Sequence, residues 1–209
     1  MKIRIKICGL TSPQDIEAVN AARPDCIGFV FAESRRRLTP RQALALKRQL
    51  DPEIKSVGVF VNASQSDILD ICSQGILDAV QLHGDEPPAF AESVRRETGC
   101  PVIKAFRIKD RESLEAVKTF PEADCLLLDA YNKNAYGGTG EAFNWELLGE
   151  NRINSPFFLA GGLKIENIEK AIKTVRPYGV DISSGVETDG RKDPDKIMEI
   201  INKIRRFDQ

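Results

Sequence analysis

The sequence predicts an α/β fold in which residues 1–209 form one domain, a single (β/α)8 or TIM barrel. Short apolar runs rich in strand formers recur about eight times, roughly 22 to 33 residues apart, and a helical pattern follows each run. With 209 residues, 42% of them hydrophobic, the chain can fill one core and little more than one domain. No linker or low-complexity segment interrupts the series.

The expected strands are continuously apolar at several places, for example over residues 26–31 and 125–128. Continuous apolar runs are typical of parallel strands that are buried on both faces. An open, doubly wound sheet is the alternative, but it usually has fewer strands and often a glycine-rich first turn. The first run ends Ile7-Cys8-Gly9-Leu10, which is not such a turn. The expected strands begin near Ile3, Asp25, Lys55, Leu77, Pro101, Ala123, Pro156 and Tyr178.

Three helix starts are marked by an N-cap residue followed by proline, which favours the first helical position. These pairs predict a helix from Pro13, a second over 41–50 and a C-terminal one over 195–206. In the second helix the spacing of the apolar side chains predicts one buried stripe. The pairs are Ser12-Pro13, Thr39-Pro40 and Asp193-Pro194, and the stripe is formed by Ala43, Leu46 and Leu50 beside Lys47.

Composition argues against several classes of function. The 30 Lys and Arg residues balance 31 Asp and Glu residues, so nothing indicates binding to nucleic acid or to an anionic membrane. A single histidine and five dispersed cysteines without a C-x-x-C pair predict no metal site, and no cofactor is expected. The N-terminus lacks the apolar run of a signal peptide, and no stretch is apolar enough to span a bilayer. Reduced thiols in the cytoplasm are the expectation.

Reactive residues gather where the expected strands end, which is where barrel enzymes place their active sites. Cys8 ends the first run and Asp129 ends the run of leucines at 126–128. A thiolate can act as a base, and a carboxyl group can act as an acid when burial favours its protonated form. The alternatives are that Cys8 is a small buried hydrophobe and that Asp129 caps a loop.

Glycine and serine follow the seventh and eighth expected strands, at Gly161-Gly162 and Ser183-Ser184-Gly185. Many barrels bind phosphate with these two loops, through backbone N–H groups and a short helix. Ordinary turn chemistry is the alternative. The sequence therefore favours a phosphate site formed by residues 161–162 and 183–185, with Gly161, Gly162, Ser184 and Gly185 among its candidates.

Three other segments are candidates for binding. The run Arg35-Arg36-Arg37 could hold a carboxylate or phosphate bidentately, although at most one or two of its side chains can point into a site. His83 could donate a proton or anchor a ligand, or it could be structural. The glycine-rich loop 131–143 has the composition of a mobile lid or of a flexible surface loop, and its candidate residues are Gly137, Gly138 and Gly140.

Together these residues resemble the phosphoribosylanthranilate isomerase family. The similar motifs follow the family's order and cover nearly the whole chain, and their combination is far more specific than any one of them. They are Lys6-Ile7-Cys8-Gly9, Gly28-Phe29-Val30-Phe31, Ser34-Arg35-Arg36, Val59-Phe60-Val61-Asn62, Val80-Gln81-Leu82-His83-Gly84, Leu128-Asp129, Gly137-Gly138-Thr139-Gly140, Gly161-Gly162-Leu163 and residues 180–187.

The resemblance implies an Amadori rearrangement of N-(5-phosphoribosyl)anthranilate in tryptophan biosynthesis. By similarity, Asp129 is the general acid that opens the ribose ring, and Cys8 is the general base that removes the C2′ proton. The family's Ser-x-Arg pattern assigns the anthranilate carboxylate to Arg36, and Asp181 is a ribose-hydroxyl contact. Lys6 alternates with Cys8 along the strand, so we expect Lys6 to face the thiol and favour its ionisation.

Three rival interpretations remain open. The histidine-pathway barrel that catalyses the same type of rearrangement uses aspartates at both catalytic strand ends, whereas Cys8 stands at the first one here. A metal-dependent pentose-phosphate epimerase needs more histidines than this chain has. A non-catalytic ligand-binding barrel would not need both an acid and a base. The sequence leaves the assembly open between a monomer and a homodimer.

Overall fold

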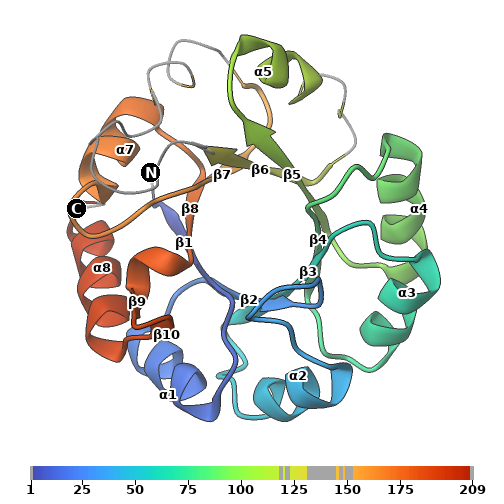
Figure 1. Cartoon of the computed structure of the whole chain (residues 1–209), viewed down its shortest axis with the longest axis horizontal. Coiled ribbons are helices and arrows are strands. Elements are labelled where there is room, and N and C mark those ends of the chain that lie inside the picture. Colours follow the sequence, from blue (N-terminus) through green and yellow to red (C-terminus); the bar gives the residue numbers. More distant parts are fainter. Residues whose placement is uncertain are drawn as a thin grey trace.

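Eight parallel strands close into a barrel in the order of the sequence, and helices surround it (Figure 1). The computed structural model describes residues 2–117, 120, 123–130, 145, 148 and 153–207. The closed order of the eight strands confirms the predicted (β/α)8 barrel, and a strand begins near each predicted start. The strands are β1 Arg4–Cys8, β2 Cys26–Val30, β3 Lys55–Phe60, β4 Ala79–Leu82, β5 Val102–Ile108, β6 Cys125–Ala130, β7 Phe157–Ala160 and β8 Gly179–Ile182.

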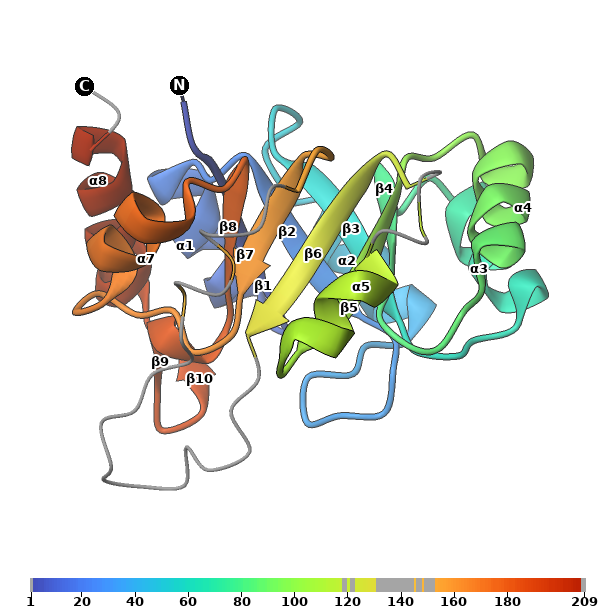
Figure 2. The ribbon, with the colours of Figure 1, turned by 90° about the horizontal axis from the view of Figure 1, so that it is seen from above.

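The described helices cover the outside of the barrel, and a small hairpin follows the last barrel strand (Figures 1 and 2). None of these helices has the length and apolar character needed to cross a bilayer. The helices are α1 Pro13–Ala22, α2 Pro40–Lys47, α3 Gln65–Ser73, α4 Pro88–Thr98, α5 Arg111–Val117, α7 Ile168–Val175 and α8 Pro194–Phe207, with the 3-10 turn η1 Ser184–Val186 and the hairpin strands β9 Glu187–Thr188 and β10 Arg191–Lys192.

The predicted helix starts are correct, but α2 is shorter than predicted. Ser12 and Thr39 cap α1 and α2 with reciprocal capping boxes. Helix α2 ends at Lys47, whereas the apolar spacing predicted a helix to Leu50. Beyond Lys47 the chain continues in tight turns, in which the N–H groups of Gln49 and Leu50 donate to carbonyls three residues back instead of four. Leu50 is nevertheless buried beyond the helix end.

Alternation along the strands divides the buried side chains into two groups. Ile5 and Ile7 of β1 join the large cluster between strands and helices, while Leu127 of β6 belongs to a smaller cluster formed by strand residues inside the barrel. Side chains two positions apart on a strand share a face. Asp129, two residues beyond Leu127, therefore points into the barrel above an apolar layer.

Asp25 directly precedes β2 and links the last helix to the first strands, at the end of the barrel where the strands begin. Arg205 of α8 donates to Asp25 Oδ2 over 2.7 Å and to the carbonyl of Ile3 over 2.9 Å. Asp25 also accepts from the Ile5 backbone N–H and from Arg4. Burial alone would raise the pKa of Asp25, but hydrogen bonds from Arg4 and Arg205 outweigh it and lower that pKa.

We expect Asp25→Asn to lower the free energy of unfolding by about 1–3 kcal/mol at neutral pH, because charge-assisted hydrogen bonds are lost. A carboxyl group with a lowered folded-state pKa contributes stability above its ordinary pKa of about 3.9 and loses it as the pH falls through the folded value. The difference from wild type should therefore shrink below about pH 4. Urea denaturation at neutral pH and below about pH 4 measures this difference, with the exposed Glu92→Gln as control. An undiminished difference at acidic pH would contradict the argument.

Candidate active site

The carboxyl ends of the strands meet at one end of the barrel, beside the β9–β10 hairpin (Figure 2). The first group there is a buried ion pair beneath Cys8. Lys6 Nζ donates to Asp181 Oδ2 over 2.7 Å, and the two residues face each other in the β1–β8 register. The Lys6 side chain is fully buried and that of Asp181 is 8% exposed. The structure thus brings Lys6, Cys8 and Asp181 together in the barrel interior.

The thiol of Cys8 lies beside β2 in space that glycine leaves open. A Cβ atom added at Gly28 would collide with Cys8 Sγ, so a side chain at that position would displace the thiol. Burial raises the pKa of Cys8, the Lys6 ammonium opposes the rise and Asp181 adds to it. Lys192 opposes the rise as well. The net result is a raised pKa, which means that the thiolate is a minor but strongly basic species at neutral pH.

The charge state of Lys6 follows from its partner. Burial disfavours its ammonium form, but the attraction of Asp181 is stronger and the pKa of Lys6 is raised. A cation therefore persists below Cys8 throughout the physiological pH range. The expectation that Lys6 acts electrostatically on the thiol agrees with this arrangement.

Asp129 and His83 approach each other from β6 and from the end of β4. His83 Nε2 lies 3.6 Å from Asp129 Oδ2, and the two side chains are 21% and 26% exposed. On the other side of the ring, His83 Nδ1 is 3.2 Å from Gln81 Nε2. Asp129 also lies between Arg107 and Ala160 in the strand registers. The structure thus places two of the predicted site residues, His83 and Asp129, in one row with Gln81.

The three predicted arginines have different environments. Arg36 is the most buried, and its Nε and Nη2 atoms donate to the two carboxylate oxygens of Glu187 at 2.8 and 3.1 Å. A Cβ at Gly9 would strike Arg36 Cδ, so this arginine lies across the end of β1. Arg35 is 54% exposed and pairs with Glu187 from outside. Arg37 is 53% exposed and pairs with Glu33.

A buried lysine completes this cluster. Lys192 Nζ donates to Glu187 Oε1 over 3.0 Å and to the carbonyl of Ser183 over 2.8 Å. Burial alone would raise the pKa of Glu187, but Lys192 and then Arg36 outweigh it and lower that pKa. Glu187 is therefore a carboxylate that holds three cationic side chains at the mouth of the barrel.

The two predicted phosphate loops touch each other. Gly161 and Gly162 have φ angles of 91° and 62°, in the left-handed region that favours glycine. A Cβ at Gly185 would collide with the carbonyl of Leu163, so only glycine allows the η1 turn to lie this close to the loop after β7. Ser183, directly before η1, donates through Oγ to the carbonyl of Cys8 over 3.0 Å. These loops are thereby joined to the strand end that carries Cys8.

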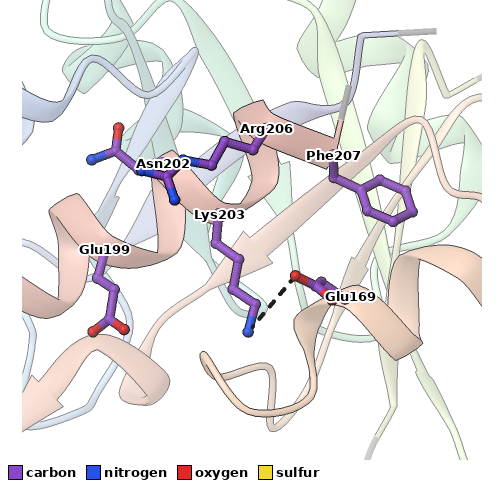
Figure 3. A pocket seen from close by; sticks show the side chains of 6 residues that line it. All are labelled: Glu169, Glu199, Asn202, Lys203, Arg206 and Phe207. Carbon is purple, nitrogen blue, oxygen red and sulfur yellow. Dashed lines mark ion pairs between the residues drawn. The ribbon is translucent and has the colours of Figure 1, made fainter. Parts of the chain in front are cut away.

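The expected lid residues Gly137, Gly138 and Gly140 lie outside the described residues. Among the described residues, no three His, Cys, Asp or Glu side chains come together as a metal site. A separate pocket lies between α7 and α8 on the outside of the barrel (Figure 3). Its walls carry Lys203 and Glu169, 3.8 Å apart, and none of its lining residues belongs to a strand end. The reactive side chains lie elsewhere.

Sequence reasoning did not single out Gln81, Glu187 or Lys192 as functional candidates. Gln81 carries a recognisable signal, because it alternates with His83 and must share its face of β4. Glu187 ends the motif at residues 180–187, but nothing local indicates its ion pairs, and Lys192 carries no signal, because both lie in a short hairpin whose position depends on the packing of the whole barrel end.

With the geometry described, comparison with known proteins gives a consistent result. A family model described as N-(5'phosphoribosyl)anthranilate (PRA) isomerase matches residues 5–203. Two proteins named N-(5'-phosphoribosyl)anthranilate isomerase are 48% and 46% identical to the chain. The first, from Thermoanaerobacter sp. (strain X514), aligns over 97% of this chain and 98% of its own length, and the second, from Acetivibrio thermocellus, over 98% and 96%.

Solved structures agree with the sequence relatives. The phosphoribosyl anthranilate isomerase of Thermotoga maritima superposes with a TM-score of 0.88 at 38% identity, covering 98% of this chain and 99% of that one. A phosphoribosyl anthranilate isomerase in complex with reduced 1-(o-carboxyphenylamino)-1-deoxyribulose 5-phosphate has a TM-score of 0.84 at 35% identity, with the same coverage.

The ion pair beneath Cys8 generates a prediction about thiol reactivity. Lys6→Met removes the nearest cation, so the pKa of Cys8 should rise further and its alkylation by iodoacetamide should begin at higher pH. The double variant Lys6→Met/Asp181→Asn removes both opposing charges and should lie between wild type and the single variant. Mass spectrometry that quantifies Cys8 separately from the other cysteines makes the measurement, with the exposed Lys2→Met as control. An unmoved alkylation profile in Lys6→Met would refute the electrostatic role.

Proposed function

The chain belongs to the phosphoribosylanthranilate isomerase family, and we propose that Cys8 and Asp129 perform the proton transfers of its reaction. The enzyme converts N-(5-phosphoribosyl)anthranilate into 1-(2-carboxyphenylamino)-1-deoxyribulose 5-phosphate, a step of tryptophan biosynthesis. The reaction is an isomerisation, so every atom of the substrate remains in the product. What the protein must supply is an acid, a base and a fixed substrate.

Asp129 acts as the general acid. It protonates the ribose ring oxygen, the ring opens, and the anthranilate nitrogen forms a Schiff base with C1′. Cys8, as thiolate, then removes the C2′ proton, and the electron pair moves through C2′ and C1′ to give an enolamine. In the tautomerisation to the ketone C1′ gains a proton and the C2′ hydroxyl loses one, so that over the whole cycle Cys8 gives up the proton it took and Asp129 regains the proton it gave. The observation that carries this proposal is that Cys8 and Asp129 project from β1 and β6 at the same end of one barrel.

The substrate's two anionic groups find separate partners. We assign the carboxylate of the anthranilate ring to Arg36, the least exposed of the three arginines, which lies across the end of the strand carrying Cys8. Glu187 uses two of the N–H donors of Arg36, and the other donors of the planar fork remain for the substrate. The phosphate is assigned to backbone N–H groups of Gly161, Gly162 and Gly185 and to the Ser184 hydroxyl.

Two further contacts orient the ribose portion. Asp181 Oδ1 is buried and has no hydrogen-bond partner in the described part of the chain, so it can accept from a ribose hydroxyl. His83 lies beside Asp129, and we assign it to the same reacting portion of the substrate. Asp181 and His83 thus bind and orient the substrate, while Asp129 and Cys8 remain the acid and the base.

We further propose that the 209 residues act as a single catalytic domain, as a monomer or a homodimer, because all the proposed roles fall on one chain. One Thermotoga maritima relative is described as a dimeric enzyme from which monomers were generated. A cytoplasmic location is proposed because all five cysteines are free thiols, and a catalytic thiol is best preserved where thiols stay reduced.

The acid and base roles are tested by Cys8→Ser and Asp129→Asn. Phosphoribosylanthranilate is generated in situ and its fluorescence loss is followed. Each variant should lose roughly 10²- to 10⁴-fold in turnover, because one proton-transfer group is removed. Circular dichroism checks that both variants remain folded. A folded variant with wild-type turnover would remove that residue from the mechanism.

The carboxylate assignment is tested by Arg36→Lys, which keeps the charge and loses the fork geometry. A charge-assisted hydrogen bond contributes about 1.5–3 kcal/mol, so KM should rise roughly 10- to 100-fold with a smaller change in kcat. Arg37→Lys is the matched control, because Arg37 pairs with Glu33 outside the cluster. Equal KM values for the two variants would contradict the assignment.

A further inference from the structure

Gln81 is a buried amide that the proposed reaction does not use. It lies on β4, its residue is 1% exposed, and its side chain faces the barrel interior like that of His83 two residues later. Its Nε2 atom lies 3.2 Å from His83 Nδ1. Its Oε1 atom is buried without a hydrogen-bond partner among the described residues. An unpaired buried carbonyl costs about 1–3 kcal/mol, which an apolar side chain would avoid.

With a neutral ring and an ionised Asp129, one arrangement of protons matches all three groups in the row Gln81, His83, Asp129. A carboxylate accepts hydrogen bonds and donates none, so a hydrogen on His83 Nε2 suits the side that faces Asp129 Oδ2, but at 3.6 Å this contact does not fix the tautomer by itself. In a neutral ring Nδ1 is then the acceptor, and Gln81 must turn its NH₂ group toward it. That amide orientation is the one in the structure.

The same arrangement suits the protonated form of Asp129. The Oδ2 atom can accept from His83 Nε2–H as a carbonyl oxygen, which leaves Oδ1 to carry the proton. When that proton is transferred, the N–H already aimed at Oδ2 stabilises the new carboxylate. The separation of 3.6 Å is longer than a hydrogen bond, but hydrogen bonds of catalytic groups often shorten only when substrate is bound.

We propose that Gln81 is a positioning residue that holds neutral His83 as the Nε2–H tautomer, so that His83 donates to Asp129 Oδ2 and the transferable proton resides on Oδ1. The proposal rests on the proposed role of Asp129 as general acid. Its first half, the tautomer of His83, does not depend on that role and can be measured without turnover.

The chain is well suited to the measurement because it contains one histidine, so a tag-free sample gives the ¹⁵N signals of a single imidazole. In its neutral form the wild-type ring should show a pyrrole-like Nε2 and a pyridine-like Nδ1. Gln81→Met removes the donor and should give a mixture of tautomers. Gln81→Glu supplies an acceptor and should move the hydrogen to Nδ1. Gln65→Met is the matched control, because Gln65 donates to Ser93 on the outer helices.

Kinetics then connect the tautomer to the reaction. Gln81→Met should lower kcat about tenfold with little change in KM, because a proton-transfer step is slowed while binding is kept. A wild-type ring with its hydrogen on Nδ1 would overturn the proposal even if no variant folds. So would unchanged ¹⁵N shifts in folded Gln81→Met and Gln81→Glu, or unchanged kcat despite a changed tautomer. If Asp129→Asn keeps full turnover while the shifts change as expected, the acid assignment fails and the tautomer assignment survives.

Discussion

The ion pair between Lys6 and Asp181 is the constraint on which the barrel end depends. It joins β1 to β8, the seam where the barrel closes, and it places two opposite charges in a low-dielectric interior. Loss of one partner of such a pair typically costs about 3–5 kcal/mol, because the other charge stays buried. The pair therefore confines a cation directly below Cys8. The same contact therefore stabilises the seam and favours ionisation of the thiol.

Near the mouth, the side chains that face the barrel interior change from apolar to polar within two residues along a strand. Leu127 is followed by Asp129 on β6 and Ala79 by Gln81 on β4, so each of these two strands supplies a packing residue first and a polar residue nearer the mouth. The apolar layer keeps the strands in register, and the strand backbone then positions the polar side chains. Groups held on strands are placed more accurately than groups on loops, which suits proton transfers that tolerate little displacement.

Much of this could be predicted from the sequence, because apolar runs and alternation are local signals. The eight strands, the helix starts and the orientation of Lys6 toward Cys8 follow from periods of two and from cap residues. The end of α2 was not predicted, because the buried spacing continues past the point where backbone geometry ends the helix. The cluster of Glu187 and Lys192 could not be predicted, because a two-residue strand has no period and its partner Arg36 is 151 residues away.

The contact between Arg205 and the carbonyl of Ile3 also has a topological consequence. Residues near the two ends of the chain are neighbours in space, on the side of the barrel away from the chemistry (Figure 2). A short linker could therefore join them, and the chain could be reopened between two other βα units without changing any strand neighbour. The active site requires the cyclic order of the strands, and a circularly permuted chain would keep that order.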